Sequence, residues 1–317
     1  MFGLIPVRYG ANSACLSEKQ LFPKKGRFSR FLSGRPMQSV LTIAGFDPSS
    51  GAGVTADLMV FAAHGLFGTA CITALTVQST LGVRTTYATP AEVVEKTLAC
   101  LDVDIPPAGI KIGMLANSDN ICIICDSIAI LRQTHDGLSR VPGLPIVLDP
   151  VLRSTSGREL LDGPGTLALR ERLLPLVDWV TPNLDELAAL SGEIVASRDD
   201  LPRACQALQE SIDRGVDGNR LGVFATGGHL DPPDDFLLLP NGEGHWLPGE
   251  RVVTQAGHGT GCALSSAFLS RLVLEEAPRA AALAAKLYVA GALRAASKIG
   301  TGTWPINYLW TLHQVID

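Results

Sequence analysis

Short apolar segments alternate with helical segments along most of this 317-residue chain. The segments expected to form strands are 39–44, 68–77, 108–113, 145–149, 179–181 and 221–225. Those expected to form helices are 54–64, 89–101, 119–133, 166–174, 183–190, 200–214, a segment starting at 262, and 279–298. Strands that are apolar along their whole length are typical of a parallel sheet covered by helices on both faces. The chain is therefore predicted to be an α/β protein with a mostly parallel central sheet.

Local signals refine two parts of this prediction. Thr89 and Glu92 have the spacing of a capping box, with Pro90 expected at the first helical position. Asn241-Gly242, between apolar runs at 236–239 and 245–247, predicts a small hairpin appended to the sheet. Ligands of open α/β sheets bind beyond the carboxyl ends of the strands, so the loops that follow the strands are the expected place of a site.

Residues 1–36 differ in composition from the rest of the chain. They hold seven Lys and Arg residues and a single acid, Glu18. We expect a basic, disordered N-terminal extension over 1–36, followed by one folded domain over 37–317. An organelle presequence and a start codon placed too far upstream both remain open for the extension. The expected location is cytoplasmic, or mitochondrial if 1–36 is a presequence.

Composition and charge narrow the range of functions. The formal net charge of −5 at pH 7 argues against nucleic acid as the main partner, because polyanion binders carry a basic surface. No uninterrupted apolar run reaches about 18 residues, so a membrane span is not expected. The seven cysteines are scattered and odd in number, which suits a reducing compartment. Cys122 and Cys125 form a C-x-x-C pair that is interpreted as one face of a buried helix, rather than as a redox or zinc site.

A glycine-rich segment, Gly257-His258-Gly259-Thr260-Gly261-Cys262, runs directly into an apolar helix. Glycine lets the backbone approach a ligand closely, and the unpaired N–H groups of a helix start favour an anion. Cys262 lies at the mouth of the helix, where a thiolate is stabilised, so we expect the pKa of its thiol to be lowered. The segment therefore predicts an anion site with a base or nucleophile attached. P-loop, dinucleotide-binding, H-E-x-x-H and G-x-S-x-G motifs do not occur in the sequence.

Seven motifs, taken together in this order and spacing, resemble the hydroxymethylpyrimidine and phosphomethylpyrimidine kinases of thiamine synthesis, a branch of the ribokinase-like family. The motifs span residues 44–57, 73–80, 111–115, 147–151, 181–186, 227–229 and 258–262. The resemblance implies a ribokinase-like fold and transfer of phosphate from ATP, with Mg²⁺. The implied substrate is 4-amino-5-hydroxymethyl-2-methylpyrimidine, and its monophosphate in a second step to the diphosphate. The expected partners are thus small molecules, and the sequence leaves a homodimer open.

The resemblance also implies roles for individual residues. Gly259, Thr260 and Gly261 would hold the migrating phosphate, and Cys262 would accept the proton of the hydroxyl group. The residues that would bind the pyrimidine are Gly45, Asp57, Gln78, Met114 and Val151. Asp149 and Glu186 would bind Mg²⁺, and Asn183, Glu186, Thr226 and Gly228 would bind the nucleotide or its phosphates. An amide such as that of Gln78 offers a donor and an acceptor to a ring nitrogen and an amino group.

Simpler interpretations of these residues stay open. Asn183 and Glu186 have the spacing of helix capping, and Asp149 is also suited to cap a helix or turn. Asp57 could be an ordinary surface charge on a helix. Gln78 could be an amide facing water, and Met114 could be plain core.

The chain departs from the family pattern at several positions. Thr226 and Thr155 stand where the family tends to have lysine, and Phe46 and Ser50 stand where smaller residues or glycine are usual. Arg153 or Arg158 could replace the missing positive charges.

Three rival functions follow from the residues. A pyridoxal kinase of the same fold is the nearest rival, although Cys262 and Gln78 favour the pyrimidine. The missing lysines keep a non-catalytic, pyrimidine-binding regulatory protein open. A redox role for the C-x-x-C pair is the most distant.

Overall fold

A computed structural model describes residues 37–138, 143–154, 157–212 and 221–313 of the chain. Within these ranges, nine strands form one sheet in the order β3-β2-β1-β4-β5-β6-β7-β8-β9. The strands are β1 Ser39–Phe46, β2 Phe67–Ser79, β3 Gly82–Ala88, β4 Ile110–Ile112, β5 Ile146–Leu148, β6 Trp179–Val180, β7 Gly222–Ala225, β8 Asp235–Leu238 and β9 Gly244–Leu247. The basic N-terminal extension expected at 1–36 lies outside the described residues.

The six central strands, from β2 to β7 in the sheet order, are parallel, whereas β3, β8 and β9 are antiparallel to their neighbours. The prediction of a mostly parallel α/β sheet is therefore confirmed. The predicted hairpin at 236–247 also forms, but it extends the sheet at one edge and is not a separate appendage. Strand β3 was not predicted, because its sequence GVRTTYA lacks a continuous apolar run.

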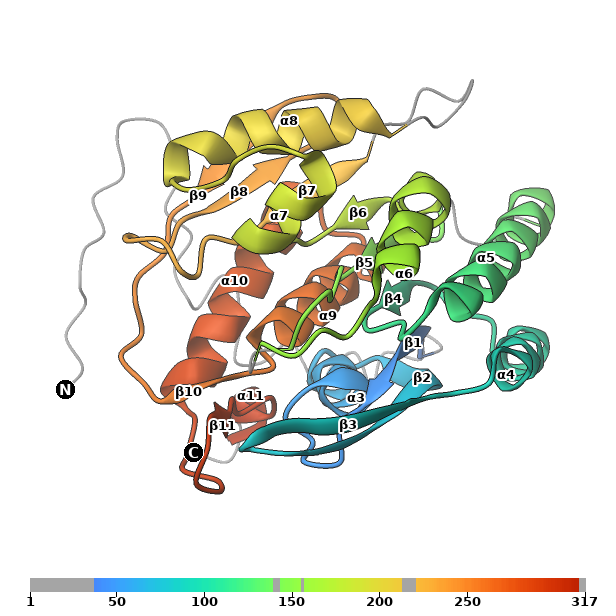
Figure 1. Ribbon diagram of the computed structural model, residues 1–317, viewed down its shortest axis with the longest axis horizontal. Helices are drawn as coiled ribbons and strands as arrows, with labels where there is room; N and C mark the ends of the chain where they lie inside the picture. Colours follow the sequence, from blue (N-terminus) through green and yellow to red (C-terminus); the bar gives the residue numbers. More distant parts are fainter. Residues whose placement is uncertain (1–36, 139–142, 155–156, 213–220, 314–317) are drawn as a thin grey trace.

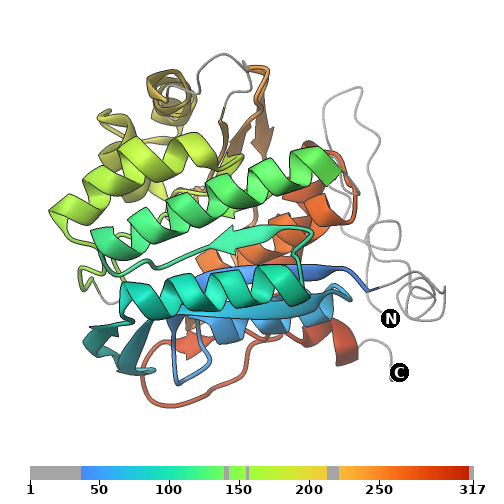
Figure 2. The ribbon, with the colours of Figure 1, turned by 90° about the vertical axis from the view of Figure 1, so that its right-hand side faces the viewer.

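Helices cover both faces of the sheet. One face is covered by α3 Gly53–Ala63, α9 Thr260–Val273 and α10 Pro278–Arg294, and the other by α4 Ala91–Asp104, α5 Ser118–Leu138, α6 Gly163–Ala168, α7 Leu184–Ser191 and α8 Leu201–Ser211 (Figures 1 and 2). Each face has its own hydrophobic core. In β1, for example, Val40 belongs to the core under α3 and α9, while the next residue, Leu41, belongs to the core under α4 and α5. This alternation follows from the two-residue period of a strand.

One helix start was predicted wrongly. Helix α4 begins at Ala91, and its N-cap residue is Pro90, whose side chain can accept no hydrogen bond. Thr89 does not cap the helix, because its N–H group donates to the carbonyl of Thr73 in β2. Glu92 pairs with Lys96 instead. The main chain at Thr89 is thus still hydrogen-bonded to the sheet, two residues before the helix begins.

Short elements complete the fold. Strands β10 Ala256–His258 and β11 Trp304–Pro305 form a small parallel sheet next to the start of α9. The helix expected at 166–174 starts earlier, in α6, and continues as the π-helix η1 Leu169–Leu173 and the 3₁₀-helix η2 Leu174–Leu176. The 3₁₀-helix η3 Arg198–Asp200 precedes α8. The short helix α11 is Trp310–His313. None of the helices in the described ranges is both long and apolar enough to cross a membrane.

The C-x-x-C pair lies on α5, as the interpretation as a helix face predicted. Cys125 is buried in the core with Ile121, Ile124 and Ile128, and Cys122 is half-buried. Among the described residues, no three His, Cys, Asp or Glu side chains gather in a group that could hold a metal ion. Cys125 thus packs in the core beneath α5, while the Cys122 sulfur accepts a hydrogen bond from Arg172 at 2.7 Å.

Candidate active site

The first turn of α9 presents free backbone amides. Gly259 is the N-cap residue, and the N–H group of Ala263 donates to the Gly259 carbonyl. The N–H groups of Thr260, Gly261 and Cys262 come before this bond, so they have no acceptor within the helix and carry the positive end of its dipole. Cys262 is half-buried in the same turn. The backbone therefore has the geometry of an anion site at the four residues from which the sequence predicted one.

Only glycine fits at position 259. Its φ is 86°, in the left-handed region, and a Cβ atom added there would lie 1.9 Å from the Tyr308 hydroxyl oxygen and 2.1 Å from the Gly51 carbonyl oxygen. The Tyr308 hydroxyl group donates to that carbonyl at 2.6 Å. Gly259 therefore lets the C-terminal segment and the glycine-rich loop after β1 meet at the start of α9.

Asp149 follows β5 at the carboxyl edge of the sheet and lies opposite the first turn of α9. A Cβ atom added to Gly261 would be 3.9 Å from each of its carboxylate oxygens, and the Ser265 hydroxyl group donates to Oδ2 at 3.3 Å. Burial, the largest cause, and the charge of Asp57 raise the pKa of Asp149, against the opposing effect of Lys111. A carboxylate and helix amides that face the same space can hold a cation and a phosphate next to each other.

A buried ion pair lies beneath this site. Lys111, at the centre of β4, and Asp57, on α3, are both fully buried, with 2.9 Å between Nζ and Oδ2. The Lys111 nitrogen is also 3.9 Å from Asp149 Oδ2. Burial alone would lower the pKa of Lys111, but the charges of Asp57, Cys262 and Asp149 outweigh it and raise that pKa. Lys111 therefore remains an ammonium ion at the base of the site.

The place of Asp57 corrects the interpretation of this residue as a surface charge. Its Oδ2 accepts from the Thr42 hydroxyl group at 2.6 Å as well as from Lys111, and its Oδ1 accepts from the Ser266 hydroxyl group at 2.8 Å. The side chain is not a surface charge, because it is fully buried. The network thus ties Asp57 to Lys111 and to α9, and its contact with the pyrimidine stays a prediction.

The expectation that the pKa of the Cys262 thiol is lowered is wrong. Burial, the largest cause, raises that pKa to about 12. The Lys111 ammonium lowers it, but the negative charges of Asp149 and Asp57 raise it further. Burial and the two carboxylates therefore determine the direction of the shift, and local sequence reveals neither of them.

Asn183 and Glu186 form a complete capping box at the start of α7. The N–H group of Glu186 donates to Asn183 Oδ1 at 2.9 Å, and the N–H group of Asn183 donates to Glu186 Oε2 at 3.0 Å. Burial and the nearby charge of Asp149 raise the pKa of Glu186 to about 8. The capping interpretation is therefore confirmed, and the same geometry brings Glu186 within electrostatic reach of Asp149.

Three of the predicted pyrimidine residues lie at neighbouring strand ends. Gly45, near the end of β1, is so close to Met114, which follows β4, that a Cβ atom on it would be 2.9 Å from the Met114 sulfur. Met114 is mostly buried, and Val151, two residues after Asp149, is half-buried. Gly45 is thus needed for the thioether to approach β1, and the structure brings Gly45 and Met114 together.

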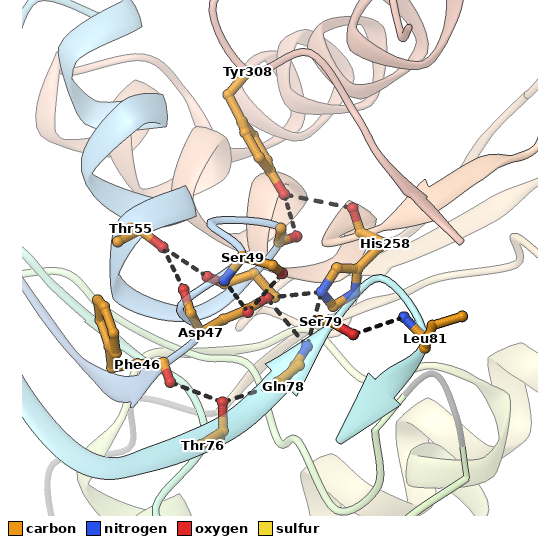
Figure 3. A network of polar contacts seen from close by, with 12 residues as sticks. Phe46, Asp47, Ser49, Thr55, Thr76, Gln78, Ser79, Leu81, His258 and Tyr308 are labelled. Carbon is orange, nitrogen blue, oxygen red and sulfur yellow. Dashed lines mark hydrogen bonds and ion pairs between the residues drawn. The ribbon is translucent and has the colours of Figure 1, made fainter. Parts of the chain in front are cut away.

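Gln78, the remaining predicted pyrimidine residue, lies in a polar network with Asp47 and His258 (Figure 3). Its Nε2 atom is 3.1 Å from Asp47 Oδ2 and 3.0 Å from His258 Nε2. Its Oε1 atom accepts from the Thr76 hydroxyl group at 3.3 Å. The Gln78 amide therefore contacts other side chains, and the interpretation as a loop amide that faces water is wrong. His258 connects Gln78 to the start of α9.

Thr226 and Gly228 follow β7, on the side expected for the nucleotide. The Thr226 N–H group donates to the Pro182 carbonyl at 2.9 Å, and Gly228 is exposed. The Arg251 guanidinium donates to the Gly228 carbonyl at 3.4 Å. Although the lysine usual in the family is missing, a positive charge still lies beside this loop.

The proposed compensation by Arg153 or Arg158 stays a prediction. The Arg158 guanidinium donates to the carbonyl of Arg84 in β3 at 2.7 Å, and Arg153 is exposed. Thr155 lies outside the described residues. Ser50, another departure from the family pattern, has a φ of 58° and donates its N–H to the Asp47 carbonyl at 3.0 Å. That left-handed conformation is one that glycine adopts more easily.

Comparison with known proteins decides the family. The phosphomethylpyrimidine kinase family model matches residues 47–307. The chain belongs to this family. It is 34% identical over 277 residues to the hydroxymethylpyrimidine/phosphomethylpyrimidine kinase of Haemophilus influenzae, covering 86% of this chain and 97% of that protein. It is 38% identical over 273 residues to the thiamine biosynthesis multifunctional protein ThiED of Corynebacterium efficiens, covering 85% of this chain but only 35% of that longer protein.

The fold of this phosphomethylpyrimidine kinase family member also matches solved structures. A pyridoxal kinase from Bacillus subtilis, solved as an ADP complex, is similar with a TM-score of 0.74 and 26% identity, over 88% of this chain and all of that chain. The chain is therefore a phosphotransferase with a ribokinase-like fold. Within this family member, Lys111 is the site residue that sequence reasoning missed, although it stands in one of the quoted motifs. An aliphatic strand, Ile110-Lys111-Ile112, was the available signal, because a lysine there must be buried and paired.

Proposed function

We propose that this protein transfers the γ-phosphoryl group of ATP to the hydroxymethyl group of 4-amino-5-hydroxymethyl-2-methylpyrimidine, and then phosphorylates the monophosphate to the diphosphate. The observation that carries the proposal is the convergence of three groups at one sheet edge. These are the free amides of α9, the Cys262 thiol and the Asp149 carboxylate. The name of the Haemophilus influenzae relative supports the same substrate and both steps.

Each group has a role in this transfer. The amides of Thr260, Gly261 and Cys262 would bind the migrating phosphoryl group, whose charge spreads over its oxygens during transfer. The substrate oxygen forms a bond to phosphorus while the bond between phosphorus and ADP breaks. The hydroxyl proton passes to the Cys262 sulfur in its thiolate form. Since the pKa of the thiol is about 12, the thiolate that accepts this proton is a minor species near neutral pH.

The residues present fit a magnesium ion held mostly by water and phosphate. Asp149 and Glu186 are mostly buried, and each has a raised pKa, to which the charge of a neighbouring carboxylate contributes. Mg²⁺ usually takes only one or two carboxylates from a protein, with water and substrate phosphates as its other ligands. We propose that these two carboxylates hold Mg²⁺, which supplies charge neutralisation to the phosphates of ATP.

A pyridoxal kinase activity is the second candidate. The structural similarity to the Bacillus subtilis pyridoxal kinase favours it, and pyridoxal is also a flat heterocycle with a hydroxymethyl group. The Gln78 amide offers both a donor and an acceptor, which suits a ring nitrogen next to an amino group. Asp149, Glu186 and the free amides of the first turn of α9 are groups that phosphoryl transfer requires. We therefore propose an enzyme and not a protein that only binds the pyrimidine.

Product masses distinguish these candidates. The wild-type protein would be incubated with ATP and Mg²⁺ and with either compound, and the products would be identified by mass spectrometry. The proposal predicts products with one and two added phosphoryl groups on the pyrimidine. Phosphorylation of pyridoxal alone would refute it.

Assembly and location are less constrained. A homodimer and a cytoplasmic enzyme remain our predictions. Both relatives described above are bacterial, and they lend no support to a mitochondrial protein.

A further inference from the structure

We propose that Asp47 is a positioning residue that fixes which end of the Gln78 amide faces the substrate, and thereby selects a ring with an amino group. The inference rests on the proposed function, because it concerns the pyrimidine of that reaction. It is carried by the network that joins Asp47, Gln78 and His258 (Figure 3), the last of which lies two residues before the start of α9.

The Asp47 carboxylate is buried and fully engaged. Its Oδ1 atom accepts from the Ser49 N–H group at 2.8 Å and from the Ser49 hydroxyl group at 2.7 Å. Its Oδ2 atom lies 2.8 Å from His258 Nε2 and 3.1 Å from Gln78 Nε2. Burial raises the pKa of Asp47, but the hydrogen bonds from His258 and Ser49 outweigh burial and lower it overall. The carboxylate is therefore an acceptor at every contact.

The need for a proton between each donor and acceptor fixes the orientation of the Gln78 side-chain amide. If Oε1 of Gln78 took the place of Nε2, it would face Asp47 Oδ2 at 3.1 Å with no proton between two oxygens. The His258 ring nitrogen, 2.8 Å from the same oxygen, must likewise donate its proton there. Asp47 Oδ2 thus accepts two N–H groups, and the 3.0 Å contact between Gln78 and His258 is between two donors. The carboxylate, and not the histidine, determines the orientation of the amide.

With its orientation fixed, the Gln78 amide has Oε1 and one N–H of Nε2 available for a ligand. Oε1 has two lone pairs, and the single Thr76 hydroxyl proton is shared between Oε1 at 3.3 Å and the Phe46 carbonyl at 3.0 Å. Oε1 can therefore accept from an exocyclic amino group, while the second N–H of Nε2 can donate to an adjacent ring nitrogen. Gln78 and His258 also line a hollow of about 60 Å³, together with Ser154 and Thr303. This edge matches an aminopyrimidine and mismatches a ring with the reversed pattern.

The pair of substrates that tests this is the 4-aminopyrimidine and its 4-oxo analogue. The oxo analogue has an acceptor in place of the amino group and an N–H in place of the ring acceptor. For the wild type, we expect kcat/KM for the amino compound to exceed that for the analogue by about a hundredfold, because a polar site rejects a ligand that leaves its groups unpaired. In Asp47→Asn the neutral amide can accept or donate, so Gln78 can turn, and the preference should fall to about tenfold or less.

Ser49→Ala is the matched control. It removes a donor to the other oxygen of Asp47 but leaves Oδ2 and its charge in place, so the preference should stay within about threefold of the wild-type value. Because general damage to the fold lowers both activities together, the ratio reports on recognition alone. An unchanged ratio in Asp47→Asn, or an equal loss in Ser49→Ala, would overturn the inference.

Wild-type binding keeps the inference testable if Asp47→Asn does not fold. Calorimetry with the two compounds and the wild-type protein should show that the amino compound binds at least about tenfold more tightly. Equal affinities would refute the locked amide while leaving the proposed kinase function intact. A wild-type protein that neither binds nor phosphorylates the amino compound would refute the proposed function itself, and the inference with it.

Discussion

The buried pair of Lys111 and Asp57 makes the sharpest prediction about stability. Both side chains have no exposed surface, and 2.9 Å separates Nζ from Oδ2. Lys111→Met keeps a long unbranched side chain but leaves the Asp57 charge in the core with only two hydroxyl donors. Removing one partner of a buried ion pair typically costs about 3–5 kcal/mol. Since whole domains are stable by roughly 5–15 kcal/mol, we expect a loss of about a fifth of the total or more.

Urea unfolding of four proteins would measure this. The wild type, Lys111→Met, Asp57→Asn and the double variant form a thermodynamic cycle, with free energies of unfolding from linear extrapolation and slopes checked for equality. The double variant removes both charges, and the amide that replaces the Asp57 carboxylate keeps hydrogen-bonding atoms for the two hydroxyl neighbours. It should therefore be more stable than Lys111→Met by at least about 1 kcal/mol. Additive effects of the two substitutions, or a loss below about 1 kcal/mol in Lys111→Met, would contradict the account.

Three further predictions concern the site. Gly259→Ala should lose about 2–5 kcal/mol of unfolding free energy in urea, from the left-handed backbone and the clash at its Cβ, whereas Gly257→Ala, which meets nothing within 4 Å, should lose little. Alkylation of Cys262 by iodoacetamide, followed by mass spectrometry, should be slower than that of exposed Cys100 and should rise about tenfold per pH unit to pH 9, since its pKa is about 12; a plateau below pH 8 would contradict this. Mg²⁺ binding, followed by calorimetry, should tighten from about pH 6.5 to 8.5, because Glu186 must lose a proton whose pKa is about 8, and Glu186→Gln should remove that dependence.

The fold could be predicted where local pattern and tertiary packing agree. The central strands are mostly apolar, because helices cover both of their faces, and this signal can be read without knowing which segments pair. Strand β3 was missed because its residues are half-buried or exposed, show no apolar run, and are held in the sheet by pairing with β2 alone. The start of α4 was misplaced because Thr89 donates its N–H to β2, a contact that the capping-box spacing does not reveal.

The part of the site that could be predicted consists of residues that are neighbours in the sequence. Gly259 and the amides of α9 are consecutive in the chain, so the sequence alone indicated an anion site. Lys111 and Asp57 are 54 residues apart, and only the sheet brings them together beneath Asp149. The same carboxylates, with burial, raise the pKa of Cys262, which the helix start alone was expected to lower. Charges from residues distant in the sequence, which local patterns do not reveal, therefore contribute to the direction of the Cys262 pKa shift.

The central claim is that the amides of α9 hold the migrating phosphoryl group while the Cys262 sulfur accepts the proton. Turnover of ATP with the hydroxymethylpyrimidine, measured together with pyrimidine binding in wild type and Cys262→Ala, tests it most directly. A general base contributes about 10²–10⁴-fold, so kcat should fall by at least about a hundredfold in Cys262→Ala, with a dissociation constant for the pyrimidine within about threefold of the wild-type value. An unchanged kcat in Cys262→Ala would contradict the claim.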